Sequence, residues 1–137
     1  MILLDTHVLV WLVEDDRRLG PGARSRIERT RDAEGLGVSA ITPWEIAMLV
    51  ATGGLHLALE VGVWVDRALS LPAVALLPIE PAIAVDSVRL PGEFHADPAD
   101  RLIVATARHW PATLLTGDQA ILRYAAGGHF DAIDAGI

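Results

Sequence analysis

The repeated change between short apolar runs and longer helical stretches constrains the fold of this chain most. Five apolar runs bounded by chain-breaking residues are predicted strands, at residues 2–5, 36–39, 74–77, 113–116 and 130–133. Stretches of helical character lie at residues 9–14, 21–34, 43–52, 59–71, 82–88, 98–110 and 119–126. Strands that alternate with helices predict a mainly parallel, five-stranded sheet with helices on both faces, a three-layer α/β/α fold.

The length of the chain predicts one domain. A sequence of 137 residues without a linker or repeat is expected to form a single domain over residues 1–137. Its hydrophobic fraction of 52% is high for so small a globule, so some apolar surface is expected to meet another chain. The apolar runs are shorter than the roughly 20 residues that span a bilayer, and the first residues do not read as a signal peptide. We therefore expect no membrane segment and a cytoplasmic protein.

Two missing residue types exclude several classes of function. The sequence has no cysteine, which excludes disulfides, zinc–thiolate sites and thiol nucleophiles. It also has no lysine, which excludes a Walker-type phosphate loop, a Schiff-base lysine and a receiver-type phosphorylation site. The net charge of −7 argues against broad binding to nucleic acid, which depends on cations that neutralise phosphates. Any chemistry on nucleic acid is expected to be local and assisted by a metal.

Two predicted helix starts share one pattern, a capping residue followed three positions later by an acid. The first is Thr42-Pro43-Trp44-Glu45 and the second is Asp97-Pro98-Ala99-Asp100. Thr42 and Asp97 are the expected caps, with proline at the first helical position. Glu45 and Asp100 therefore have a structural reason to stand where they do, independent of any catalytic role.

Four acids fall close to the predicted carboxyl ends of strands. Asp5 ends the first strand and Asp118 follows the fourth, while Glu45 and Asp100 begin the helices after the second strand and before the fourth. Ligands of such sheets bind beyond the carboxyl ends of the strands. Carboxylates gathered there raise each other's pKa unless a cation compensates them, and Mg²⁺ and Mn²⁺ prefer oxygen ligands. The pattern predicts a metal site suited to phosphodiester hydrolysis.

The motifs around these acids resemble those of PIN-domain proteins of the VapC toxin type. They are Asp5-Thr6, Ser39-x5-Glu45, the run from His95 to Arg101 followed by Leu102-Ile103-Val104-Ala105-Thr106-Ala107, and Thr116-Gly117-Asp118. The resemblance spans nearly the whole chain. It implies a PIN-like fold with strand order 3-2-1-4-5 and an endoribonuclease that depends on Mg²⁺ or Mn²⁺. It also implies an RNA substrate, a cognate antitoxin and a homodimer.

The resemblance assigns roles to individual residues. Asp5 and Asp100 are implied as the principal metal ligands, with Glu45 and Asp118 completing the catalytic set. Thr6 and Thr116 would orient a ligand or a water molecule, and Asp97 would serve first as a helix cap. Gly117 departs from the family pattern, which often has a larger residue there.

Two other functions remain open at this point. One is a magnesium-dependent phosphatase, although the haloacid-dehalogenase type would need an acid two residues after Asp5, where His7 stands. The other is a non-catalytic α/β interaction domain, against which the four acids at strand ends count.

For several other residues, a structural role is as plausible as a functional one. His95 is expected either to contact substrate or to bond within its loop. His7 lies near Asp5 and could tune it, but an ordinary structural or surface residue is favoured. Arg101 is expected to reach a phosphate or to form a local ion pair. The four tryptophans are expected in core or interface packing.

Two helical surfaces can likewise be interpreted as structural or as binding surfaces. Six of the eleven arginines fall between Arg17 and Arg31, where a solvated face with an Arg24–Glu28 pair is favoured over a phosphate-binding patch. The apolar surfaces of helices 43–52 and 59–71 suit core burial and partner binding equally.

Overall fold

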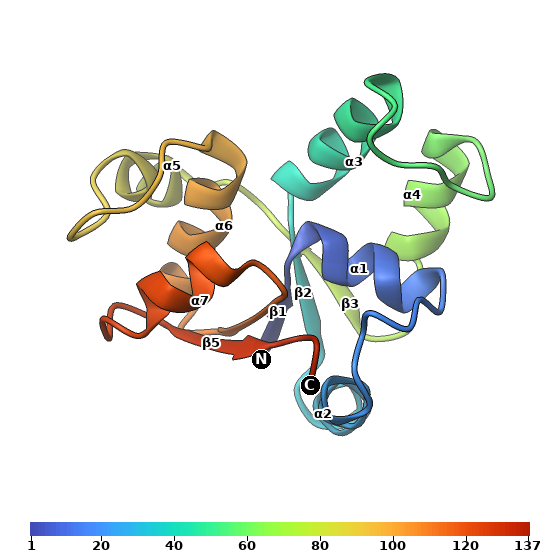
Figure 1. Cartoon of the computed structure of the whole chain (residues 1–137), viewed down its shortest axis with the longest axis horizontal. Coiled ribbons are helices and arrows are strands. Elements are labelled where there is room, and N and C mark those ends of the chain that lie inside the picture. Colours follow the sequence, from blue (N-terminus) through green and yellow to red (C-terminus); the bar gives the residue numbers. More distant parts are fainter.

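A single, wholly parallel sheet forms the centre of the computed structural model, which describes all residues 1–137 (Figure 1). The strand order is β3-β2-β1-β4-β5, which confirms the expected fold class. The strands are β1 (Ile2–Leu4), β2 (Leu36–Ser39), β3 (Val74–Leu77), β4 (Thr113–Thr116) and β5 (Asp131–Asp134). The central strand β1 pairs with β2 on one side and β4 on the other. Residues from distant parts of the chain therefore meet at its end.

Helices cover both faces of the sheet (Figure 1). They are α1 (Thr6–Val13), α2 (Pro21–Ala33), α3 (Ile41–Ala51), α4 (Val61–Leu69), α5 (Pro81–Val88), α6 (Pro98–His109) and α7 (Gln119–Ala125). One apolar cluster joins α1, α2, α3 and α4 to the sheet, and a second joins α5, α6 and α7. Along β1, Ile2 and Leu4 belong to the first cluster and Leu3 to the second, as expected for a strand buried on both faces.

The starts of α1, α3, α4 and α5 differ from the sequence prediction, and local contacts explain the first two. Helix α1 begins at Thr6, three residues early, because Asp5 leaves the strand and caps the helix. Helix α3 begins at Ile41, whose N–H donates to the Ser39 hydroxyl at 3.2 Å. The assignment of Thr42 as the cap is therefore wrong: Thr42 lies buried inside the first turn, with its hydroxyl 3.0 Å from that of Thr6. The cap at Asp97 is confirmed, since its Oδ1 accepts from the Asp100 N–H at 3.1 Å.

Two arginines have partners other than those expected. Arg24 pairs with Asp15 at 2.9 Å, so the expected pair with Glu28 is wrong. Arg101 donates to the main-chain carbonyls of Ser87 and Phe94, at 2.7 and 3.1 Å. It therefore fastens the loop before α6 and forms no ion pair.

Large apolar side chains are distributed unevenly between the core and the surface. Trp64 is buried, as predicted, but Trp44 is 54% exposed and so lies outside the core. Met48 and Val63 are also exposed, so helices α3 and α4 keep apolar surface that the chain itself does not cover. None of the helices has the length and apolar composition needed to span a membrane.

Candidate metal-binding site

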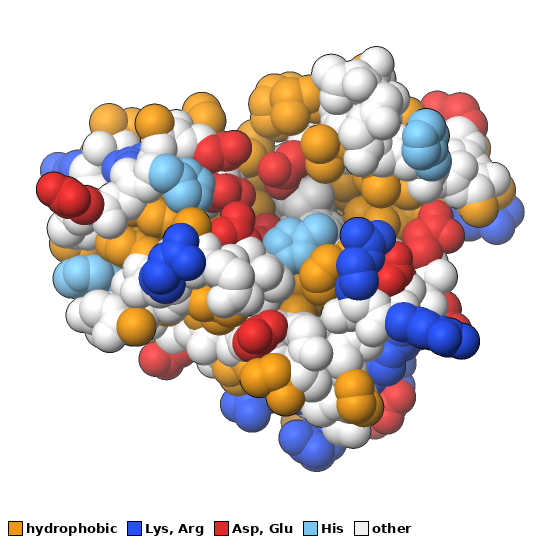
Figure 2. Space-filling model, in the orientation of Figure 1, with side chains coloured by type: hydrophobic (Ala, Val, Ile, Leu, Met, Phe, Trp, Pro, Cys, Tyr) orange, Lys and Arg blue, Asp and Glu red, His pale blue; other side chains and the backbone are white.

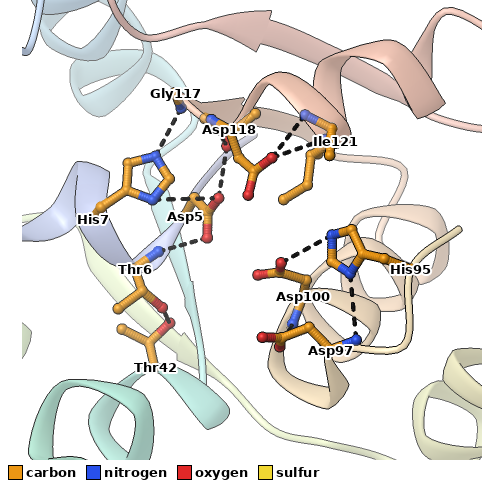
Figure 3. Close-up of polar contacts among 12 residues, drawn as sticks. Asp5, Thr6, His7, Thr42, His95, Asp97, Asp100, Gly117, Asp118 and Ile121 are labelled. Atoms are coloured by element: carbon orange, nitrogen blue, oxygen red, sulfur yellow. Dashed lines mark hydrogen bonds and ion pairs between the residues drawn. The ribbon is translucent and has the colours of Figure 1, made fainter. Parts of the chain in front are cut away.

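Acidic side chains line a hollow at the carboxyl ends of the strands, between α3 on one side and α6 and α7 on the other (Figure 2). The sequence prediction placed Asp5, Glu45, Asp100 and Asp118 at this edge. The structure brings all four into one electrostatic group, since the charges of Asp5, Glu45 and Asp118 each act on the Asp100 carboxyl. The close-up in Figure 3 shows three of these acids, with Asp97, around a common space.

Asp5 is the most deeply buried acid of the site, with 2% of its surface exposed. It follows β1 directly, and its Oδ1 accepts from the Thr6 N–H at 2.8 Å. Its Oδ2 accepts from the Thr116 hydroxyl at 2.6 Å, across the β1–β4 pairing. Both oxygens thus have a protein donor, which fixes the carboxylate in place.

Asp118 is held in a similar way at the start of α7. Its Oδ1 accepts from the N–H groups of Ala120 and Ile121, at 2.8 and 3.2 Å. Its own N–H donates to the Thr116 hydroxyl at 3.0 Å. The buried Thr116 hydroxyl therefore connects the two acids, by donating to Asp5 and accepting from Asp118.

His7 lies against Asp5 and fixes the turn that carries Asp118. Its Nε2 accepts from the Gly117 N–H at 2.8 Å, so the ring proton is on Nδ1, which lies 3.7 Å from Asp5 Oδ2. A Cβ on Gly117 would lie 2.7 Å from Trp11 Cη2, so only glycine fits beneath the two rings. Sequence reasoning favoured an ordinary structural or surface residue over one that tunes Asp5, and the hydrogen bond from Gly117 gives His7 a structural role.

Asp100 stands on the opposite side of the space, at the start of α6 (Figure 3). Its Oδ2 lies 3.2 Å from His95 Nε2, while His95 Nδ1 accepts from the Asp97 N–H at 3.3 Å. Burial raises the pKa of Asp100 to about 8, and the charges of Asp5, Asp97, Glu45 and Asp118 add to the effect. Without a compensating cation, this carboxyl group holds a proton at neutral pH.

Glu45 extends from α3, and only one of its two carboxyl oxygens has no partner in the protein. Its Oε1 is buried without a hydrogen-bond partner. Burial raises the pKa of this carboxyl, a hydrogen bond with the Thr6 side chain opposes that shift, and the charges of Asp5 and Asp97 add to it. A buried acceptor of this kind costs free energy unless a ligand or water satisfies it.

The donor set suits a divalent cation. One ligand atom each from His95, Asp100 and Asp118 lies within 4.8 Å of the others. The orphaned oxygen of Glu45 and the raised pKa of Asp100 are both features that a bound cation relieves. Because His95 Nδ1 accepts from the Asp97 N–H, the ring proton is on Nε2, which faces Asp100 and positions that carboxyl group. Sequence reasoning considered His95 only for substrate contact or a loop hydrogen bond.

Thr6 connects the two helices next to Asp5 and Glu45. Its hydroxyl lies 3.0 Å from that of Thr42, which joins the first turns of α1 and α3. This contact sets the helix that carries Glu45 against the helix that Asp5 caps.

Comparisons with known proteins agree with the topology. Residues 2–127 match the PIN domain family. The chain is 37% identical over 120 residues, 88% of each protein, to Ribonuclease VapC22 of Mycobacterium tuberculosis.

Solved structures give a similar result. A VapBC2 complex from Rickettsia felis bound to promoter DNA contains a chain with a TM-score of 0.72 at 17% identity, with 98% of both chains covered. A FitAB complex bound to a DNA fragment contains one with a TM-score of 0.59 at 25% identity, covering 100% of this chain and 96% of that one.

Proposed function

The chain belongs to the PIN domain family, and from that premise we propose that it is a metal-dependent endoribonuclease, the toxin of a type II toxin–antitoxin pair. The proposal covers residues 1–137 as one domain. The observation that supports it most strongly is the meeting of four acids at one sheet edge, with the Glu45 oxygen left unpartnered. RNA is the proposed substrate because the relative that is 37% identical over 120 residues is named as a ribonuclease.

The proposed cofactor is Mg²⁺ or Mn²⁺. Asp5 and Asp100 are the proposed principal ligands, with Glu45 and Asp118 completing the catalytic set directly or through water. A divalent ion held there supplies charge that stabilises the phosphate oxygens and lowers the pKa of water. Carboxylate oxygens are the ligands that these ions prefer.

The chain's own residues divide the remaining work. Thr116 holds Asp5 and Asp118 at fixed separation, and Thr6 sets α1 against α3. The free Oε1 of Glu45 can accept a hydrogen bond from a water molecule and orient it for in-line attack on phosphorus. Asp97 acts mainly as the cap that presents Asp100.

The proposed partners are a cognate antitoxin and a second copy of the chain. Structural neighbours include a toxin–antitoxin complex from Klebsiella pneumoniae. The exposed apolar residues Trp44, Met48 and Val63 on α3 and α4 offer surface for such contacts. With RNA as substrate, the cytoplasm is the proposed site of action.

The test is cleavage of total RNA by purified, partner-free protein with Mg²⁺ or Mn²⁺. We expect discrete fragments that disappear with EDTA. Asp5→Asn and Asp100→Asn should each lower the cleavage rate by at least about 100-fold, because each removes a ligand charge without removing volume. Asp131→Asn, an exposed acid on β5, is the matched control and should cleave as the parent does.

Other outcomes assign other functions. RNA left intact by folded protein, together with release of phosphate from p-nitrophenyl phosphate, would indicate the phosphatase. Intact RNA and intact p-nitrophenyl phosphate would indicate the non-catalytic interaction domain. Equal cleavage by both Asn variants and the parent would contradict the proposed metal site.

A further inference from the structure

A second hollow lies directly beside the acids, between the loop before α6 and helix α7. Its volume is about 410 Å³, within the range of ligand pockets, and its lining includes Glu93, Phe94, His95, Arg123, Tyr124 and His129. His95 belongs both to the acidic site and to this second hollow. Its Nε2 lies 3.2 Å from Asp100, and its ring forms part of the wall of the hollow. Whatever occupies the hollow therefore sits next to the proposed scissile bond.

Aromatic rings make up much of the lining. Phe94 stacks on Tyr124 with ring centroids 4.6 Å apart and an angle of 19°, and His95 lies 4.1 Å from Phe94. The Tyr124 hydroxyl donates to the Pro91 carbonyl, which holds the ring in place. His129 extends the set, with its ring 5.5 Å from that of Tyr124. Tyr124 is buried, so it supports the set from within, and the exposed rings of His95 and His129 are the ones that suit the flat face of a nucleobase.

The rim carries an arginine that the protein does not use. Arg123 is exposed and forms no ion pair and no side-chain hydrogen bond, unlike Arg101 and Arg108, whose charges also act on Tyr124. Arg101 is occupied by carbonyl groups, and Arg108 by Asp86 and the His129 carbonyl. Glu93 is the one acid in the lining, and it lies on the exposed loop opposite α7. A free guanidinium beside aromatic rings suits a phosphate next to a stacked base.

We propose that this aromatic hollow binds the nucleotide adjacent to the scissile phosphate in a single-stranded RNA, with the base against the exposed rings of His95 and His129 and a flanking phosphate on Arg123. The inference rests on the proposed ribonuclease activity and specifies how the substrate lies. Single strands are required because a base must leave its stack to reach the rings. In a chain with a net charge of −7, an unpaired cation in the lining of the hollow is expected to contribute to holding the RNA.

The first test measures binding of a fluorescent single-stranded oligoribonucleotide to the Asp5→Asn protein, with Mg²⁺ present, across a salt series. Adding Arg123→Gln should raise Kd about 5- to 10-fold and reduce the slope of log Kd against log salt by about 0.7, the value for one lost phosphate contact on a single strand. Arg29→Gln is the control, since it removes an equally exposed charge on α2. An Arg123→Gln effect no larger than that of Arg29→Gln would overturn the proposal.

The second test addresses the base and uses the parent enzyme. Abasic nucleotides are placed one at a time around the cleavage site of an oligonucleotide. We expect KM to rise about 10-fold, with kcat changed little, at one adjacent position only, because base–aromatic stacking contributes to binding of the uncut strand. Uniform KM values at all positions would overturn the assignment of the hollow to a base.

The two tests separate this inference from the proposed function. Cleavage by the parent with an ineffective Arg123→Gln leaves the ribonuclease standing and rejects the hollow as its subsite. Binding that depends on Arg123 in a parent without cleavage rejects the nuclease and keeps the hollow as an RNA-binding site.

Discussion

The two halves of the acidic site differ in what satisfies their charges. On the strand side, Asp5 and Asp118 accept hydrogen bonds from main-chain N–H groups, and Asp5 also from Thr116. On the helix side, Glu45 has a buried oxygen without a partner, and Asp100 has only His95. The acidic residues of the site therefore fall into two groups, one satisfied by the protein and one not. The strand side is rigid before any ligand arrives, and the helix side becomes stable only when a cation does.

The largest test of this contrast is metal binding itself. At a Mg²⁺ concentration about 100 times Kd, ligand linkage adds about 2.7 kcal/mol to the free energy of unfolding, which raises Tm by roughly 10 °C. Differential scanning calorimetry with and without EDTA measures the shift. Asp100→Asn should lose most of it, whereas Asp131→Asn should keep it. A full shift in Asp100→Asn would place the cation elsewhere.

A sharper test compares the stability of the two halves without metal. Thr116→Val removes the hydroxyl shared by Asp5 and Asp118 and should destabilise the protein by about 1–3 kcal/mol. Asp100→Asn replaces a carboxyl group that must take up a proton on folding with a neutral amide and should stabilise the protein, on the order of 1 kcal/mol. Urea unfolding in EDTA gives both values, with Thr113→Val at the other end of β4 as control. The contrast is wrong if both variants shift stability in the same direction.

The smallest effect is the pH dependence of the metal-free protein. The pKa of Asp100 is raised to about 8 in the folded state, so between pH 4 and 8 the folded chain holds a proton that the unfolded chain has released. This contribution to stability is complete below the unfolded pKa and is lost as the pH rises through about 8.

The measurement is urea unfolding in EDTA from pH 5 to 9. After allowance for solvent screening, the parent should lose on the order of 1 kcal/mol relative to Asp100→Asn over this range. Parallel pH curves for the two proteins would show that Asp100 ionises normally.

Sequence reasoning reached the fold and the edge at which the acids meet, because both follow from strand positions. Apolar runs and breakers located the strands, and the carboxyl ends of parallel strands share one edge. The strand order itself came from the resemblance of the motifs.

Local rules were less reliable where tertiary contacts compete with them. Thr42 has the sequence of a helix cap, yet its hydroxyl meets Thr6, and the helix begins earlier at Ile41. Pro43 is tolerated there because N–H groups of the first turn have no partner within the helix. The contact of His7 with Gly117 spans 110 residues, and no local pattern encodes it.

The hydrogen bond from Thr116 to Asp5 also bears on synthesis of the protein. These residues are 111 positions apart, so at 5–20 residues per second a ribosome needs roughly 5 to 20 s to add the second after the first. Strand β1 has its β4 neighbour only once that interval has passed. A nascent chain therefore carries Asp5 without a site around it until β4 has been made, and the acids gather only after that point.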